Sequence, residues 1–164
     1  MALQSMTALA SITLQQATAS VSFSGIPQNY RDLVLVAAGT MSTNNLDINM
    51  TLNSDSTDSN YSRVWMSGRG DNNTATSGTS SQRRITAWGY WGTDQVANSI
   101  AQLMDYSVTN KHKTVLVRSN RQSSGLDAIA LRWANTTAIT SLELSPTSST
   151  FAAGSTFNLY GRIG

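Results

Sequence analysis

Few side chains in this sequence could carry covalent or acid–base chemistry. His112 is the only histidine, and it lies between Lys111 and Lys113 in a pattern typical of an exposed turn. There is no cysteine, so disulfide bridges and thiolate zinc sites are excluded. A Ser-His-acid triad would need His112 as its base, and no serine lies in the G-x-S-x-G motif that presents a nucleophile. We therefore predict that the chain is not an enzyme and that it has no catalytic residues, metal site or cofactor.

The acidic residues support the same prediction. Of nine acids, eight are aspartates and the ninth is Glu143, which alternates out of an apolar segment. Glycosidases need two carboxylates at a set separation, and no spacing here marks such a pair. A further group of oxygen-bearing side chains does not follow the calcium-loop spacing and is interpreted as a polar strand face followed by a turn: Asp47, Asn49, Asn53, Asp55 and Asp58.

Aromatic residues form the most distinctive cluster. The segment Trp88-Gly89-Tyr90-Trp91-Gly92 is dense enough in rings to suggest a contact surface for a protein or a platform for a sugar. We therefore assign Trp88, Tyr90 and Trp91 to a candidate interface. Trp133 alternates with apolar residues, which predicts that it is buried.

Composition limits the partners. Only 12% of the residues are charged, and the net charge is +2. Small polar residues take the place of the missing charges, with 24 Ser, 20 Thr and 13 Asn. The basic residues are scattered, whereas nucleic-acid binding favours a basic stripe with interleaved aromatics, so we expect no nucleic-acid partner. No apolar run is long enough to span a bilayer, so we expect no membrane partner either.

Alternation of apolar and polar residues is the dominant pattern, and it predicts strands with one buried face. The clearest examples are residues 20–24, 46–52, 128–133, 142–144 and 157–163, while residues 32–38 are apolar on both faces. Further strands are expected at residues 85–91, 100–108 and 114–118, with a weaker one at 6–14. The total of about ten short strands predicts an all-β fold, a two-sheet antiparallel β-sandwich of jelly-roll type.

No segment has a convincing helical pattern. Residues 58–62 are expected to form a single turn, and residues 68–82, rich in Gly and Asn, a long exposed loop. That loop contains Arg69-Gly70-Asp71, the tripeptide that integrins recognise, which we interpret as an ordinary turn. We expect one domain over residues 1–164, the whole gene product.

Apolar residues also precede the first clear strand. Leu3, Met6, Leu9 and Ile12 lie within residues 1–12, and we interpret this segment as an N-terminal arm that docks on a neighbouring protein. Burying such side chains stabilises a contact by roughly 25 cal/mol per Å². Deleting the arm is expected to leave a folded domain that no longer binds its partner.

Three segments carry recognisable motifs in order along the chain. The first is Phe23-Ser24-Gly25-Ile26-Pro27-Gln28-Asn29-Tyr30-Arg31-Asp32-Leu33, and it resembles an F-x-x-I-P-x-x-Y-x-D-L-x-L segment found in many bacteriophage virion proteins. Two more resemble motifs of the same proteins: the second is Asn60-Tyr61-Ser62, and the third joins Ala138-Ile139-Thr140-Ser141-Leu142 to Phe151-Ala152-Ala153-Gly154-Ser155 and Leu159-Tyr160-Gly161. In the first segment we expect a tight turn between two strands, with Asp32 accepting backbone hydrogen bonds. In the last we expect a close approach at Gly161.

The resemblance implies a jelly-roll-like domain from a phage particle, and its motifs are structural, so it carries over no active site. Such domains occur in tail fibres and in small head proteins. The size of the chain, which we expect to be one domain without a long fibrous stalk, favours a capsid decoration or cement protein that binds the major capsid protein on the outer head surface, as a homotrimer. The alternative is a tail-fibre or tail-tip module that binds a host-surface glycan on the Trp88–Trp91 platform. Either role places the chain in the virion, assembled in the host cytoplasm.

Overall fold

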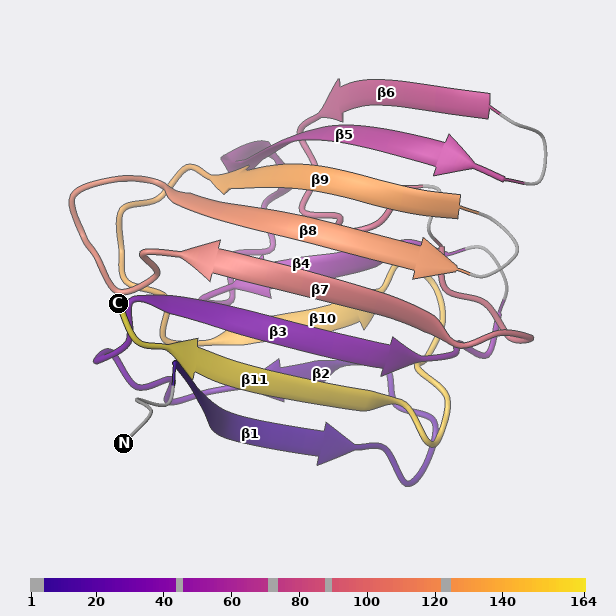
Figure 1. Cartoon of the computed structure of the whole chain (residues 1–164), viewed down its shortest axis with the longest axis horizontal. Helices are drawn as coiled ribbons and strands as arrows, with labels where there is room; N and C mark the ends of the chain where they lie inside the picture. The colour runs from indigo at the N-terminus through magenta and orange to yellow at the C-terminus, as the bar shows by residue number, and fades with distance from the viewer. Residues whose placement is uncertain (1–4, 44–45, 71–73, 88–89, 122–124) are drawn as a thin grey trace.

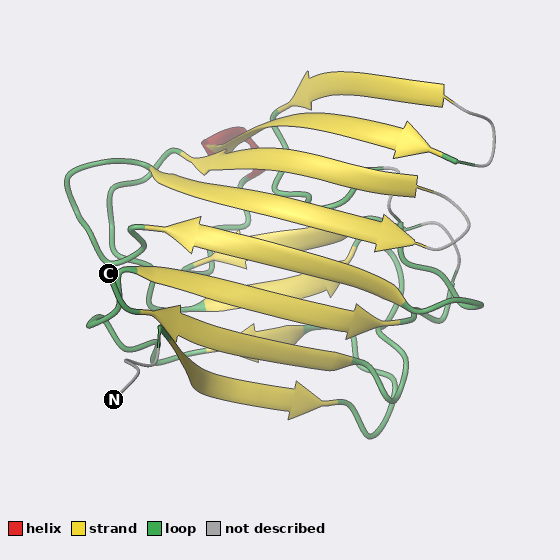
Figure 2. Cartoon of the chain, viewed as in Figure 1, coloured by secondary structure: helices red, strands yellow, loops and turns green. Residues whose placement is uncertain are grey.

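The computed structural model describes residues 5–43, 46–70, 74–87, 90–121 and 125–164. Over these residues the chain forms two antiparallel β-sheets packed face to face, with one short helical turn (Figures 1 and 2). In Figure 1 the larger sheet faces the viewer and the smaller sheet lies behind it. The predicted all-β class and two-sheet sandwich are therefore confirmed.

The larger sheet has eight strands in the order β1-β11-β3-β7-β8-β9-β5-β6, and the smaller has three in the order β2-β10-β4. The strands span β1 Met6–Thr13, β2 Val21–Phe23, β3 Asp32–Gly39, β4 Ile48–Leu52, β5 Tyr61–Arg69, β6 Thr74–Ser80, β7 Ala97–Met104, β8 Lys113–Arg121, β9 Gly125–Trp133, β10 Leu142–Pro146 and β11 Thr156–Arg162. The helical turn η1 spans Asp58–Asn60, within the turn predicted at residues 58–62.

Alternation placed most of these strands correctly, because one side chain in two faces the core. The prediction for residues 100–108 overran the end of β7. The strand ends at Met104 because Asp105 takes a left-handed backbone with φ 46°, which no strand residue adopts. Residues 85–87 and 90–91 lie outside the named strands, although Ile85 pairs irregularly with β4 through a hydrogen bond from its amide to the Ile48 carbonyl of 2.9 Å.

The prediction of a long exposed loop over residues 68–82 is wrong. Most of it belongs to the hairpin of β5 and β6, whose register runs unbroken from Arg63 opposite Ser80 to Arg69 opposite Thr74. β6 is the edge strand of the larger sheet and buries none of its side chains. With no face to bury, its sequence needs no apolar alternation, so the pattern that identifies other strands is missing. Asp71 of the integrin-like tripeptide lies outside the described residues.

The prediction of an N-terminal docking arm over residues 1–12 is also wrong for the residues that the structure describes. Met6, Leu9 and Ile12 belong to β1, which pairs with β11 over its whole length at the other edge of the larger sheet. The register shifts between Ala8 and Ala10, so Leu9 is an extra residue in a β-bulge. Leu9 and Ile12 pack against the core. Residues 6–12 are therefore part of the sandwich, and their deletion would remove a strand.

The core lies between the two sheets and is closed at one end by an aromatic group. The Trp91 ring packs on Phe151 and Phe157 with centroid distances of 5.7 and 6.2 Å, and the two phenylalanines lie 4.9 Å apart. Trp133 is buried as predicted and stacks on Tyr61 at 6.4 Å. Two groups of large rings therefore contribute to the core.

The first and third of the segments that resemble phage virion proteins contact each other. The Ile26 amide donates to the Thr140 carbonyl (3.0 Å), which joins the first segment to the third. Gly161 leaves room for the Tyr30 ring, because a Cβ at position 161 would overlap it. Asp32 accepts the backbone N–H of Asp105 at 2.9 Å. These motifs therefore act as structural links within the sandwich.

Among the described residues, no helix is long and apolar enough to cross a membrane.

Candidate interaction surface

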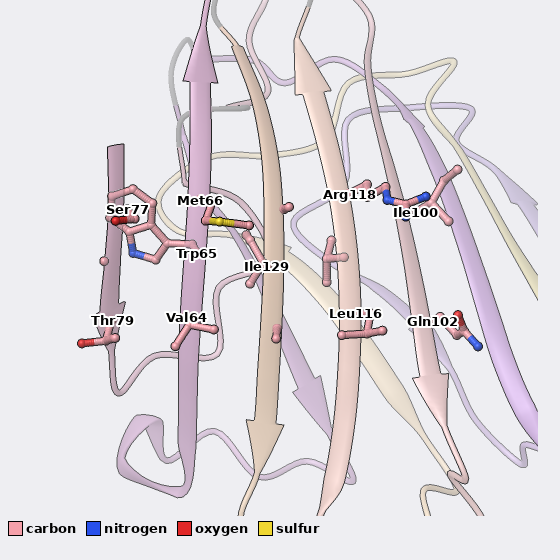
Figure 3. A pocket seen from close by; sticks show the side chains of 14 residues that line it. Val64, Trp65, Met66, Ser77, Thr79, Ile100, Gln102, Leu116, Arg118 and Ile129 are labelled. Carbon is pink, nitrogen blue, oxygen red and sulfur yellow. The ribbon is translucent and has the colours of Figure 1, made fainter. Parts of the chain in front are cut away.

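An apolar trough runs along β9 on the outer face of the larger sheet. Ala130 lies opposite Val64 of β5 on one side and Leu116 of β8 on the other. Ala128 lies one step further along, opposite Met66 of β5. Since β9 contributes only methyl groups here while its neighbours contribute long side chains, the alanines form the floor and the neighbours form the walls. Figure 3 shows these side chains from close by.

The trough is exposed to solvent although it is apolar. Its volume is about 640 Å³. Five large apolar side chains on this face are between 44 and 66% exposed: Val64, Met66, Ile100, Leu116 and Leu126. Single exposed apolar residues are normal, but a contiguous group of them marks a contact surface for another molecule.

Strand alternation explains which side chains reach this face. Val64 and Met66 point outward, and Trp65 between them points to the other face, where its ring covers Gly78 of β6 (Figure 3). A Cβ at Gly78 would lie 2.6 Å from the Trp65 Cζ2 atom, so any larger residue at that position would require the Trp65 ring to shift. The trough walls are therefore mainly aliphatic side chains and a thioether. The half-buried Trp65, whose ring packs on Gly78, is the one aromatic residue among the fourteen that line the trough.

The charges around the trough are of one sign. Arg118 of β8 lies in the wall opposite Ala128, and Arg132 lies at the end of β9 beyond Ala130. Both side chains are exposed, and neither forms an ion pair with another described residue. None of the fourteen residues that line the trough is acidic. The surface therefore combines apolar contact area with two cations that form no ion pair with a described residue.

Apart from the trough, a cluster of hydrogen-bonded polar side chains lies between the two sheets. Asp47 accepts hydrogen bonds from the Thr86 hydroxyl (2.9 Å) and from Arg84 (2.7 Å). Arg63 donates to the Thr86 carbonyl (2.6 Å) and to the Arg84 carbonyl (3.3 Å). Asp127, fully buried, accepts hydrogen bonds from the Ser67 hydroxyl and the Ala87 amide. This cluster ties the segment after β6 to both sheets.

Burial is the main cause of the shifted pKa values in this cluster. Burial raises the pKa of Asp47, and the hydrogen bond from Thr86 and the charges of Arg84 and Arg63 offset only part of that rise. Burial lowers the pKa of Arg63, against the opposing effect of Asp47. Their polar atoms are occupied by hydrogen bonds within the protein, so we interpret the cluster as a structural connection between the sheets.

Asp55, just after β4, makes another connection between the sheets. Its carboxylate accepts hydrogen bonds from the Trp133 indole of β9 (2.8 Å), the Asn60 amide (2.9 Å) and the Thr57 backbone (3.1 Å). Burial alone would raise the pKa of Asp55, but these hydrogen bonds outweigh it, and the pKa lies below the usual value of 3.8.

The candidate interface residues chosen from the sequence do not form one surface. Trp91 is fully buried in the aromatic group of the core, so its assignment to an exposed platform is wrong. Tyr90 is half-buried, and burial raises its pKa. Leu3 and Trp88 lie outside the described residues. The sequence does not indicate the trough, because no strand is predicted over residues 61–69, which form β5 and supply one of its walls.

Other chemistry-bearing residues lie apart. His112 is exposed in the turn before β8, as predicted. Lys113 beside it is buried, and its ammonium group donates to the carbonyls of Val108, Lys111 and Thr136. Among the described residues, no three histidine, cysteine or acidic side chains lie close enough together to hold a metal ion.

No protein-family model and no curated protein matches this chain. Solved structures with some likeness to it include a double mutant of alginate lyase Aly36B in complex with an alginate tetrasaccharide. That structure has 4% sequence identity and a TM-score of 0.34, covering 94% of this chain and 80% of the lyase chain. Another structure of Aly36B has 9% identity and a TM-score of 0.31 over the same shares of the two chains. A protein of unknown function from Shewanella oneidensis MR-1 has 10% identity and a TM-score of 0.24, covering 96% of this chain and 75% of that one.

These structures contradict the prediction that the chain is not an enzyme, because the chain's structural neighbours include an enzyme, alginate lyase. All the TM-scores are below 0.5, so the likeness assigns no substrate and no catalytic residue to this chain. The lack of a histidine pair, a carboxylate pair or a cysteine in the sequence is therefore no argument against an activity.

Proposed function

We propose that this chain is a structural component of a bacteriophage virion, a decoration protein that binds the outer surface of the head. The observation that carries the proposal is the exposed apolar trough along β9. Exposing apolar side chains to water is unfavourable in free energy, and a permanent contact with another protein removes that unfavourable term. The three segments that resemble phage virion proteins supply the link to a particle.

The proposed docking surface differs from the N-terminal segment that the sequence suggests. Because residues 6–12 form an edge strand, docking is assigned to the outer face of the larger sheet instead of an N-terminal arm. Self-association into a homotrimer is part of the same proposal, and the open edge of β6 supports it. That edge carries no charged residue and no proline, the features that usually keep an edge strand from pairing with another chain.

The test is the number of copies in purified particles. Particles released from the host that carries this gene are banded on a density gradient, and peptides of this chain are quantified by mass spectrometry against the major capsid protein. Hundreds of copies per particle are expected. A few to some tens would instead support the tail-fibre alternative, and absence from the particle band would overturn the virion assignment altogether.

A further inference from the structure

The dimensions of the trough limit what it accepts. Neighbouring strands lie about 4.8 Å apart, so the backbones of β5 and β8, on either side of β9, are roughly 9.6 Å apart. The walls formed by Val64 and Leu116 occupy part of that width and leave room for a single row of side chains. Adjoining hollows at Leu126 and Arg132 extend the trough along β9, and these two residues are roughly 20 Å apart. The trough therefore fits a narrow ridge about 20 Å long.

Backbone hydrogen bonding decides what kind of segment supplies the ridge. β9 already pairs with β5 and β8 on both sides, so its backbone groups are satisfied within the sheet. An extended segment lying on this face would bury its own N–H and C=O groups without partners, which is costly. An α-helix satisfies its own backbone, and its side chains at i and i+4 are roughly 6 Å apart along the axis. That spacing is close to the separation of Ala128 and Ala130, roughly 6.8 Å.

The described part of this chain offers no helix that could fill the trough. The described residues of this chain contain no α-helix, and their one helical turn, η1, has three residues. A second copy therefore has no helix to offer from the described part of its chain. It would also bring its own Arg118 and Arg132 to a surface that already has both cations and no acid to pair with them.

We propose that the trough along β9 binds one amphipathic α-helix of another protein, through an apolar ridge on the alanine floor and flanking carboxylates at Arg118 and Arg132. This rests on the proposed function in assigning the larger sheet's outer face to docking. It adds the chemistry of the partner: apolar side chains at helical spacing with aspartate or glutamate beside them. Such a helix is the class of segment that apolar grooves commonly bind.

Three synthetic peptides of about 20 residues test the proposal, a length at which an isolated helix can form. The first has leucine at i, i+4 and i+7 spacing with glutamate on both flanks. The second replaces every glutamate by lysine, and the third is the glutamate peptide with a central proline that breaks the helix. Binding to the purified chain is measured by calorimetry. The glutamate peptide is expected to bind at least about tenfold more tightly than either of the others.

Variants of the protein locate the binding site. Ala128→Phe fills the floor and is expected to weaken binding of the glutamate peptide at least about tenfold. Ala8→Phe is the matched control, because Ala8 is an exposed alanine on the same face of the sheet, in β1 at the opposite edge. Arg118→Glu is expected to reverse the preference, so that the lysine peptide binds better. Circular dichroism and thermal melts confirm that each variant is folded.

Each other outcome overturns the proposal. If no peptide binds more tightly than about 1 mM, the trough is not a helix site. If the proline peptide binds as well as the glutamate peptide, the occupant is extended. If sedimentation shows the chain self-associating and Ala128→Phe abolishes that state, a second copy covers the trough. The copy number in purified particles is independent of all three results, so the virion assignment and the helix site fail separately.

Discussion

The outer faces of the two sheets differ although both sheets are antiparallel and both alternate. On the smaller sheet, Leu142 and Leu144 of β10 face the core, while Glu143 between them faces outward and accepts a hydrogen bond from the Ser22 hydroxyl at 3.1 Å. On the larger sheet, the same alternation brings Val64 and Leu116 to the outer face. One face is therefore polar as water requires, and the other is apolar at its centre.

An antiparallel sheet with one face on the core normally has a polar second face. The smaller sheet follows that rule, so the departure on the larger sheet is not a general property of this low-charge sequence. Its most exposed part lies on strands β5, β9, β8 and β7, beside a floor of alanines, and Val34 and Val36 of β3 continue it as half-buried side chains. A local departure of this kind has a local cause, and a contact with another molecule is the physical cause that an exposed apolar group most often has.

The largest effect is expected from breaking the connection between the sheets, on which the comparison of their outer faces depends. Arg63→Met keeps the apolar bulk of the side chain but removes the donors to Thr86, Arg84 and Ser80. Buried acceptors then lose their partners, and Asp47 loses a nearby positive charge. We expect the free energy of unfolding to fall by about 3–5 kcal/mol, measured by urea denaturation.

Arg31→Met is the control for that change. Arg31 is exposed, and its closest approach to Asp105 is 3.8 Å. An ion pair of this kind contributes about 0–1 kcal/mol, so the control is expected to lose no more than that. Equal losses in the two variants would mean that Arg63 does not connect the sheets.

The next largest effect is expected on docking, measured as occupancy on particles, in a variant whose free energy of unfolding is nearly unchanged. Leu116→Asp places a charge in the wall of the trough, where the side chain is exposed in the free protein. Stability is expected to change by no more than about 0.5 kcal/mol. Occupancy on particles is expected to fall about thirtyfold, equivalent to about 2 kcal/mol of binding energy at a central contact.

Ala8→Asp adds the same charge to the other half of the same face, in β1. It is expected to leave occupancy on particles unchanged. Loss of occupancy in both variants would place docking on the whole face, and loss in neither would remove the trough from the docking surface.

Sequence patterns predicted the fold where a strand has one face to bury. Val21 and Phe23 alternate with serines, and Ile129 and Leu131 alternate with an alanine and an arginine, so their strands were found. β6 gives no such pattern because both of its faces are exposed. The order of the strands depends on long-range pairing, such as β11 between β1 and β3, which no local pattern encodes.

The site was predicted less well than the fold. Trp91 was assigned to a surface because rings close together in sequence suggest a platform, yet its indole is the centre of the core's aromatic group. The trough is made by register, with Ala128 and Ala130 between longer side chains of two other strands. Such a pattern crosses three strands, so it becomes visible only when their pairing is known.

A smaller effect is expected at Asp55, which links β4 of the smaller sheet to Trp133 of the larger. Because the folded-state pKa of Asp55 lies below 3.8, its carboxylate stabilises the fold at pH values above the unfolded pKa. That contribution is lost as the pH falls through the folded-state pKa. We expect Asp55→Asn to cost about 1 kcal/mol at pH 7, a value reduced for solvent screening, and progressively less below pH ~4. Urea denaturation of both proteins across this range measures the difference, and a difference independent of pH would contradict the assignment.

The smallest effect is expected on the polar face itself. Glu143→Leu replaces the carboxylate at the centre of the smaller sheet by an apolar side chain and removes the hydrogen bond from Ser22. The side chain contacts solvent, so the free energy of unfolding is expected to change by no more than about 0.5 kcal/mol, measured by urea denaturation. A single leucine here also makes no trough, because Ser22 and Thr51, opposite it on the neighbouring strands, are too short to form walls. If Glu143→Leu made the chain bind the glutamate peptide, apolar exposure alone would suffice for binding. The wall-and-floor geometry around Ala128 and Ala130 would then have no role in it.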